Sequence, residues 1–347
     1  MENIVFEVND LINQSPEYVN ATIKLGMVPM FLAMFPLTYL IPTVYVILVT
    51  MKVYLKNVVG KKDETINSYV MFTILAHEIS TFGYMLSDYA NFRIPSTGLI
   101  TAWCARQEPS RLLIVIYSCS IYFTYLSMMF PLLLAILRLI PIYYPTKNSE
   151  VRESGSRHIK QNIFQMSARI VWIATPLILL YPLLYISILI PAAGVCRQYP
   201  APFQFGGAFI HYVHSWRDIR NFPFIMLNAT IWFSLAIVAN GFLYRKLRKL
   251  GNRGQSHRYQ TAERTLTLTT LSMMISYLCN TVFLIMYGLF VTVSQWFVLL
   301  RPFGNDCDLV VVPWVFYLIH PAFKHKSQSL RKYVSSIKSA YVRNVSN

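Results

Sequence analysis

Long apolar stretches divide this chain into seven segments, each about as long as the lipid core of a membrane is thick. They fall at residues 27–51, 66–87, 110–137, 170–193, 222–244, 265–291 and 306–323, with polar or charged loops between them. Backbone polar groups inside lipid must be paired within their own segment, so an apolar stretch of about 20 residues is expected to be a helix. The pattern predicts an all-α fold, a bundle of seven transmembrane helices.

Composition agrees with a lipid surrounding. Hydrophobic residues make up 55% of the chain, charged residues only 13%, and the mean hydropathy is +0.43, whereas a soluble domain carries about 25% charged residues. The expected organisation is an extracellular tail at residues 1–26, one receptor-like bundle at 27–323 and a cytoplasmic tail at 324–347. The acidic residues of the first tail oppose a cleavable signal peptide, so the first helix is expected to act as the anchor.

Basic residues set the expected orientation. Most of the 31 Lys and Arg residues fall in segments 52–65, 138–169, 245–264 and 324–347, and loops of this kind stay in the cytoplasm. We therefore expect an outer amino terminus, a cytoplasmic carboxyl terminus and a multi-pass location in the plasma membrane. The net charge of +16 sits beside helix ends, where anionic lipid accounts for it, so the lipid bilayer is the expected partner and nucleic acid is not.

Both tails carry further signals. Asn13 and Asn20 begin acceptor sequences for N-glycosylation on the outer side, although chance matches explain them equally well. In the cytoplasmic tail, Leu330, Val334 and Ile337 recur at helical spacing between basic residues, which predicts an amphipathic helix along the inner leaflet. A disordered basic tail is the alternative.

Three of the five cysteines, Cys104, Cys196 and Cys307, fall on the expected outer side, where disulfides form. Three pairings are open, and we favour Cys104 with Cys196. This bond would tie the segment before the third helix to the loop after the fourth, above the outer cavity.

Polar and aromatic residues recur on single helix faces at spacings of three, four and seven. These candidate ligand-binding residues are Tyr117, Ser120, Thr124, Asn228, Trp232, Asn280, Phe283 and Tyr287. A cavity with aromatic walls and few polar groups suits a small organic ligand in the outer half of the bundle. For each residue taken singly, packing and hydrogen bonding between helices is the alternative.

Glu78 is the only acid near the middle of an expected helix. An ionised carboxylate there costs about 3 kcal/mol on insertion scales. Glu78 is therefore a candidate ligand anchor or protonation switch, and the alternative is a neutral carboxyl group that is hydrogen-bonded within the bundle.

A conformational switch is expected at the inner ends of the third, sixth and seventh helices. Arg138 lies at the cytoplasmic end of the third expected helix. Glu263 is the only acid among the basic residues that precede the sixth. If these helices pack together, an Arg138–Glu263 ion pair would join their inner ends. Pro313 and His320 are further candidates in the seventh helix, although proline is also simply common in membrane helices.

Signals of an enzyme are missing from the sequence. His77 and Glu78 lack the second histidine of a zinc-binding helix, and no glycine-rich phosphate loop occurs. We therefore expect no catalytic residue, no metal and no cofactor. A seven-span transporter or channel for a small solute is the alternative function, but it needs polar groups through the full depth of the bundle, and the inner halves of the helices offer few.

Two motifs carry a resemblance to a known family: the run 262–268, AERTLTL, and the run 301–308, RPFGNDCD, followed by Pro313 and Trp314. With seven expected helices and a lone arginine after the third, the chain resembles the nematode serpentine chemoreceptors, with class gamma as the nearest class. The resemblance implies a G-protein-coupled receptor on sensory cilia or other neurons. It implies an odorant or pheromone as ligand and a heterotrimeric G protein as partner.

The chain departs from the rhodopsin pattern at two places. Leu137 precedes Arg138 where an acid is expected, and the run 320–323, HPAF, stands where rhodopsin-like receptors have Asn-Pro-x-x-Tyr. The switch residues of those receptors are therefore not transferable, and Arg138, Glu263 and His320 would form a switch particular to this chain.

Overall fold

The protein is described here by a computed structural model. It describes residues 11–20, 27–60, 68–143, 153–200, 203, 205–251 and 257–319. His320 and the expected amphipathic helix of the cytoplasmic tail lie outside the described residues, and so do the side chains of Glu263 and Tyr287.

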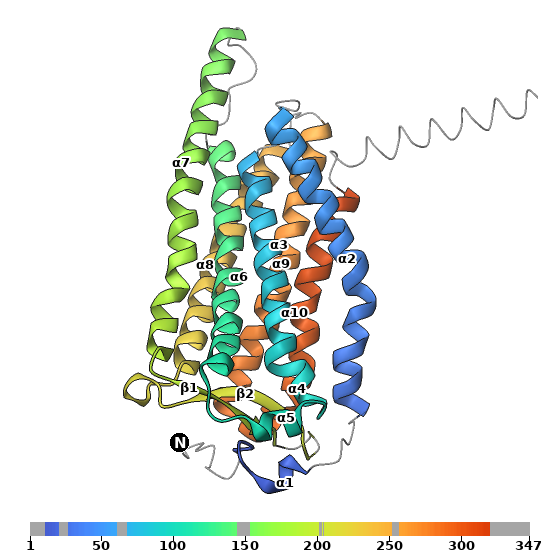
Figure 1. The fold of residues 1–347 in the computed structure, drawn as a ribbon. Helices are drawn as coiled ribbons and strands as arrows, with labels where there is room; N and C mark the ends of the chain where they lie inside the picture. Colours follow the sequence, from blue (N-terminus) through green and yellow to red (C-terminus); the bar gives the residue numbers. More distant parts are fainter. Residues whose placement is uncertain are drawn as a thin grey trace, which may run out of the picture.

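Within the described residues, seven long helices run side by side as a bundle (Figure 1). They are α2 (Met27–Gly60), α3 (Ser68–Asp88), α6 (Arg111–Tyr143), α7 (Glu153–Ile186), α8 (Phe222–Gly251), α9 (His257–Leu289) and α10 (Val291–Ile319). In this part of the chain α2, α6, α7, α8 and α9 contain stretches long and apolar enough to cross a membrane, by length and composition. The remaining two, α3 and α10, carry buried charged residues, which lower their hydropathy.

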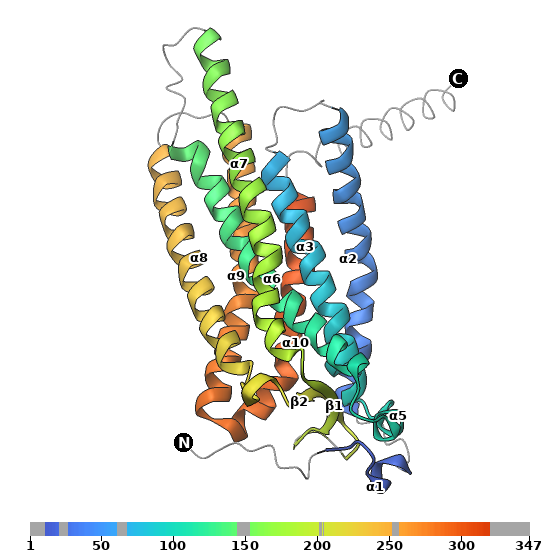
Figure 2. The ribbon, with the colours of Figure 1, turned by 60° about the vertical axis from the view of Figure 1, so that its left-hand side comes forward.

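The central helix of the bundle is α6. It packs against α3, α7 and α8 and touches α9, while α10 packs against α9, α2 and α3. Figure 2 shows α2 at the edge of the bundle, away from α8. Large apolar side chains such as Ile41, Trp172 and Leu184 are exposed on the outer helices, as expected of a surface that faces lipid.

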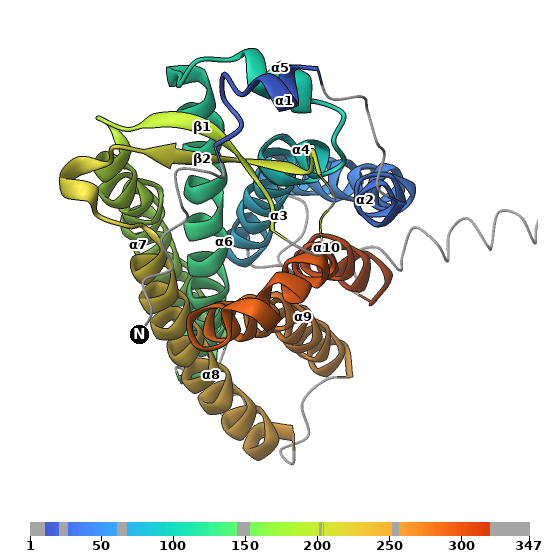
Figure 3. The same ribbon diagram turned by 90° about the horizontal axis from the view of Figure 1, so that it is seen from below.

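A β-hairpin covers one end of the bundle, which we call the hairpin end (Figure 3). It consists of β1 (Ala193–Gln198) and β2 (Ala208–Val213), which pair antiparallel. Short helices surround it: α1 (Pro16–Val19), the π-helical η2 (Tyr89–Arg93), α4 (Ile94–Ser96), α5 (Thr101–Arg106), η3 (Ser187–Leu189) and η4 (Trp216–Asp218). The all-α pattern of the sequence predicts no strand, because the hairpin is joined to its surroundings by contacts that a hydropathy pattern does not contain.

The amino-terminal segment is bound to this hairpin. Ile12 is fully buried, and its backbone N–H donates to the carbonyl of Cys196 (3.1 Å). The side chain of Asn13 accepts from the Cys196 N–H (2.8 Å) and donates to the Gln107 carbonyl (2.8 Å). This structure argues against the expected glycan on Asn13, because the amide nitrogen that would carry it is buried and hydrogen-bonded. Asn20 is exposed, and its glycosylation stays a prediction.

A disulfide joins Cys104 of α5 to Cys196 of β1, with 5.9 Å between the Cα atoms. This is the pairing that the sequence analysis favoured. Cys307, which was expected on the outer side, instead lies within α10 as a free thiol. At Gly194, a Cβ atom would come within 2.2 Å of the Ile114 nitrogen, so β1 lies directly on the first turn of α6.

The seventh long helix begins much earlier than expected. The hydropathy pattern placed its start at residue 306, but α10 starts at Val291. Arg301, Asp306 and Asp308 are therefore inside the helix. Their charges interrupt the apolar run in the sequence, and in the fold each meets polar groups of neighbouring helices, which permits burial.

Candidate functional site

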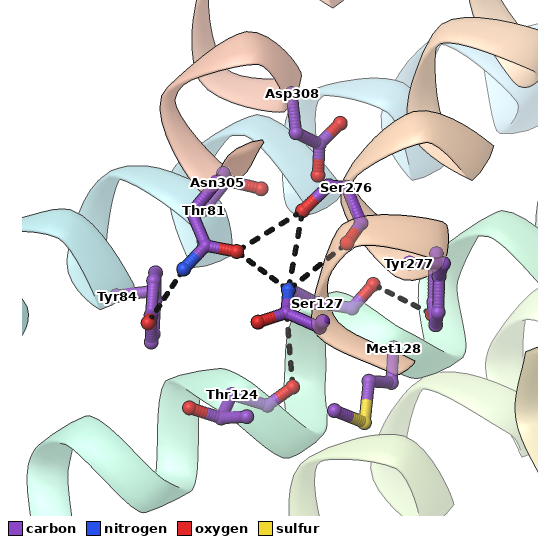
Figure 4. A pocket seen from close by; sticks show the side chains of 10 residues that line it. Thr81, Tyr84, Thr124, Ser127, Met128, Ser276, Tyr277, Asn305 and Asp308 are labelled. Atoms are coloured by element: carbon purple, nitrogen blue, oxygen red, sulfur yellow. Dashed lines mark hydrogen bonds between the residues drawn. The ribbon is translucent and has the colours of Figure 1, made fainter. Parts of the chain in front are cut away.

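A small cavity lies in the middle of the bundle between α3, α6, α9 and α10 (Figure 4). Its lining is formed by Thr81, Tyr84, Thr124, Ser127, Met128, Ser276, Tyr277, Asn280, Asn305 and Asp308. The cavity volume is about 20 Å³, which is room for an ordered water molecule. An organic ligand of ordinary size would need the lining helices to move apart.

A chain of hydrogen bonds runs along the cavity from α9 through α10 to α3. The Asn280 amide donates to Asn305 Oδ1 (2.5 Å), and the Asn305 amide donates to the Tyr84 hydroxyl (2.8 Å). Arg301 also donates to this hydroxyl through Nη2 (2.9 Å). Across the cavity, the Tyr277 hydroxyl donates to the Ser127 carbonyl (3.1 Å), which joins α9 to α6.

A buried charge cluster lies beside the cavity, toward the hairpin end. Arg93 is fully buried; its Nε donates to Asp88 (2.8 Å), and Nη1 and Nη2 donate to the two oxygens of Asp306 (2.8 and 2.6 Å). Tyr39 also donates to Asp306. The cluster thus joins α2, α10 and the π-helical turn after α3, and paired geometry of this kind is the strong form of a charged hydrogen bond.

A second buried pair lies on the other side of the cavity. Nε2 of His77 is 3.2 Å from Asp308 Oδ1, and both side chains are almost inaccessible. Glu78, next to it, is only 2% exposed. The expectation that Glu78 is the only acid near the middle of a helix is wrong, because Asp308 lies well inside α10. Asp308 also acts on Glu78 electrostatically.

At the end of the bundle opposite to the hairpin, Arg138 joins α6 to α9. It is 1% exposed, and it donates through Nη1 to Thr270 Oγ1 (2.8 Å) and through Nη2 to Thr267 Oγ1 (2.7 Å). The packing of these two helices at Arg138 is as expected, but the partners described are threonines. The Arg138–Glu263 pair stays a prediction. Pro313 is buried inside α10.

The expected ligand-binding residues fall into separate places. Thr124 and Asn280 line the cavity. Phe283 lies under the guanidinium of Arg301, with 5.3 Å from Cζ to the ring centre. Tyr117 lies below the hairpin, its ring centre 5.6 Å from that of His211. These four residues follow the axis of the bundle from the cavity to the hairpin.

The other candidates lie elsewhere. Asn228 and Trp232 of α8 contact Tyr181 of α7, the first by a hydrogen bond and the second by an edge-on ring contact at 5.8 Å. Ser120 is buried in α6, and its carbonyl accepts from Thr124. Asn228 and Trp232 therefore pack between α7 and α8. Such packing is the alternative to ligand binding that the sequence left open.

Two arginines act on His211 of the hairpin, at the hairpin side of this axis. Burial, together with the charges of Arg197 and Arg220, lowers the pKa of His211 to about 4, although a hydrogen bond to the Tyr212 carbonyl opposes the shift. The imidazole is therefore neutral at physiological pH, and the fixed positive charges near it belong to arginines.

The bundle and its polar interior agree with a comparison to known families. A family model described as "Serpentine type 7TM GPCR chemoreceptor Sru" matches residues 12–326. The chain belongs to the Sru family. A curated relative of this Sru receptor is serpentine receptor class U-26 of Caenorhabditis elegans, which is 27% identical over 273 residues, 78% of this chain and 88% of the relative.

Among solved structures, the crystal structure of squid rhodopsin is similar in fold. The TM-score is 0.51 at 12% sequence identity, over 93% of this chain and 85% of the rhodopsin chain. The Sru receptor is thus a multi-pass membrane protein and a G-protein-coupled chemosensory receptor, with a small-molecule ligand and a G protein as partners. The family and the fold are those of receptors, which are not enzymes. They give no support to the transporter or channel alternative.

The match corrects the finer assignment made from sequence. The motifs indicate class gamma as the nearest class, whereas the family model and the curated relative are of class U. The runs 262–268 and 301–308 therefore indicate the serpentine receptors correctly but not the class.

Sequence reasoning missed Tyr84, Asn305 and the charge cluster of the Sru receptor. The expected seventh helix began at Asp306, so Asn305 fell just before it, and Arg93 fell between the second and third expected helices. The charged run 301–308 was the signal in the sequence, but its meaning depends on where the helix begins. Because α10 begins at residue 291, this run lies inside the bundle, where its charges require partners.

Proposed function

We propose that this Sru receptor binds an odorant or pheromone at the central cavity, and that the ligand changes the contact between Arg138 and α9. In this proposal the hairpin end faces the outside, and the Arg138 end faces the cytoplasm and a heterotrimeric G protein. The receptor would act in the plasma membrane of sensory neurons, in their cilia. The bias of basic residues toward the loops at the Arg138 end supports this orientation.

One observation carries the proposal: α9 contributes to both sites. Ser276, Tyr277 and Asn280 of α9 line the cavity, and Thr267 and Thr270 of the same helix hold Arg138. At 1.5 Å of rise per residue, Asn280 and Thr270 are about 15 Å apart along the axis. The cavity is too small for most organic ligands, so a ligand that enters it displaces α9 and strains the hydrogen bonds of Arg138.

The other switch candidates, Glu263, Pro313 and His320, have roles in the same proposal. Glu263 precedes Thr267 on α9 and would strengthen the resting contact with Arg138. Pro313 would permit the inner part of α10, which leads to His320, to bend when α9 moves. A ligand shifts the balance only if it binds the active arrangement better than the resting one.

A direct test is to express the receptor with a promiscuous G protein and to screen volatile and pheromone-like compounds for calcium responses. We expect an active compound to lose its effect on the Asn280→Leu variant, whose larger apolar side chain fills the cavity and breaks the bond to Asn305. Solute uptake or current in cells without the G protein would contradict the proposal.

The switch is tested without a ligand. The double variant Thr267→Val, Thr270→Val keeps side-chain shape but removes the two threonine hydroxyls that accept from Arg138, so basal G-protein signalling should rise at equal surface expression. Thr230→Val is the matched control, because that exposed hydroxyl bonds only its own helix, at Met226. Basal signalling of the double variant equal to the control would show that these hydrogen bonds do not hold the resting state.

A further inference from the structure

Arg93 and Arg301 both lie in the half of the bundle that ends at the hairpin, and their surroundings differ. Arg93 donates three hydrogen bonds to the carboxylates of Asp88 and Asp306. For Arg301, a single hydrogen bond is found among the described residues, to the uncharged hydroxyl of Tyr84 (2.9 Å). No described carboxylate lies within 4.0 Å of the Arg301 nitrogens.

Arg301 nevertheless points into the bundle. Its guanidinium lies over the ring of Phe283 on α9 and reaches Tyr84 on α3, and it retains accessible surface. Asp88, although it is not paired with Arg301, acts on it electrostatically across a longer distance, and so do Tyr199 and Tyr117. Removing a guanidinium from water is costly unless acceptors replace the water, and a neutral hydroxyl with one aromatic face replaces only part of it.

Tyr84 adds a second unused donor at the same point. Its oxygen accepts from both Arg301 and Asn305, so its own hydrogen is free to donate, and no acceptor for it occurs within the described residues. Tyr84 also lines the cavity. A guanidinium edge and a phenolic O–H therefore converge where the cavity meets the space toward the hairpin.

We propose that Arg301 and Tyr84 form an anion site, and that the ligand of this receptor carries a carboxylate. The carboxylate would accept from the free N–H groups of Arg301, in the paired geometry that guanidinium groups favour, and one of its oxygens would also accept from the Tyr84 hydroxyl. This inference rests on the proposed function, since it names the chemical class of the ligand at that same cavity.

The neighbouring residues define the rest of the ligand. Phe283 and Tyr117 present aromatic surface on the hairpin side of the anion site, and Met128 adds an apolar wall of the cavity. The ligand is thus a small organic acid with an apolar or aromatic body. The positive charges of Arg197 and Arg220 that act on His211 also favour the approach of an anion from the hairpin end.

The test uses the purified full-length receptor in nanodiscs of uncharged lipid. Phenylacetate and hexanoate are compared with their methyl esters by thermal stabilisation over a concentration series. We expect the acids to stabilise the receptor and the esters to do so only at about tenfold or higher concentration, since a hydrogen bond between charged groups contributes that much.

Variants locate the effect. Arg301→Gln should lower the apparent affinity for the acids about tenfold or more and leave that for the esters unchanged. Arg301→Lys, which keeps the charge, should lie between the wild type and Arg301→Gln and guards against a folding defect. Arg106→Gln, which removes an exposed arginine at the same end of the bundle, is the matched control and should bind like the wild type.

Three results would overturn the anion site: equal effects of acids and esters, an unchanged response of Arg301→Gln, or no stabilisation by any acid. A parallel signalling assay separates this failure from that of the proposed function. Neutral compounds that signal equally through the wild type and Arg301→Gln would leave the receptor function standing. Acids that bind through Arg301 but never alter G-protein signalling would support the site and contradict the function.

Discussion

Replacing Arg93 by methionine should be among the most damaging single changes in this bundle. The substitution keeps an unbranched apolar stem but removes the guanidinium that lies between Asp88 and Asp306, where it makes hydrogen bonds of 2.8, 2.8 and 2.6 Å at zero exposure. Two buried carboxylates then lose their counterion. Removing one partner of a buried ion pair costs about 3–5 kcal/mol, a large part of the stability of most proteins.

The assay is the apparent melting temperature in detergent, followed by fluorescence-detected size-exclusion chromatography. Arg93→Met should melt well below the wild type, whereas Arg106→Met, at an exposed arginine, should melt close to it. The double variant Arg93→Met, Asp306→Asn should lose less than the sum of the two single losses, because it removes both charges of the paired contact. Additive losses, or an Arg93→Met protein as stable as the control, would refute the reasoning.

Two further predictions concern the hairpin end. Cys104→Ser removes the disulfide between α5 and β1, and the loss of about 2–5 kcal/mol expected for a native disulfide should lower the fraction of receptor at the cell surface, measured by antibody labelling of intact cells. His211 has a pKa lowered to about 4, so the unfolded chain takes up its proton at higher pH than the folded one. The stability it contributes is therefore complete above about pH 6.5 and falls toward pH 4; His211→Phe should show a smaller drop in melting temperature from pH 7.5 to pH 5 than the wild type.

The seven helices could be predicted because lipid imposes one requirement on every segment that crosses it. A run of apolar residues is sufficient to recognise α2, α6, α7, α8 and α9, which are the helices with long apolar stretches in the structure. The same criterion misplaced the start of α10, since it treats charge as a sign of a helix end. Asp306 is buried and Arg301 is partly buried, each in contact with partners on other helices, and pairing of that kind is set by tertiary structure.

The site was predicted in part for a related reason. Periodicity identifies which residues share a face of one helix, and it selected Thr124 and Asn280 correctly for the cavity. It does not show which faces meet. Asn228 and Trp232 have the same polar and aromatic character, but their side of α8 packs on Tyr181 of α7.

The close contact between Gly194 and the first turn of α6 has a mechanical consequence. Ser110 and Gly194 exchange backbone hydrogen bonds of 3.0 and 3.1 Å just before α6 begins, so the hairpin is fixed to one tip of a rod of 33 residues, about 50 Å long. The same rod passes the cavity at Thr124 and ends near Arg138. If a docking ligand tilts the hairpin, α6 would tilt with it as a rigid body. The end of α6 near Arg138 would then be displaced without any rearrangement along the helix.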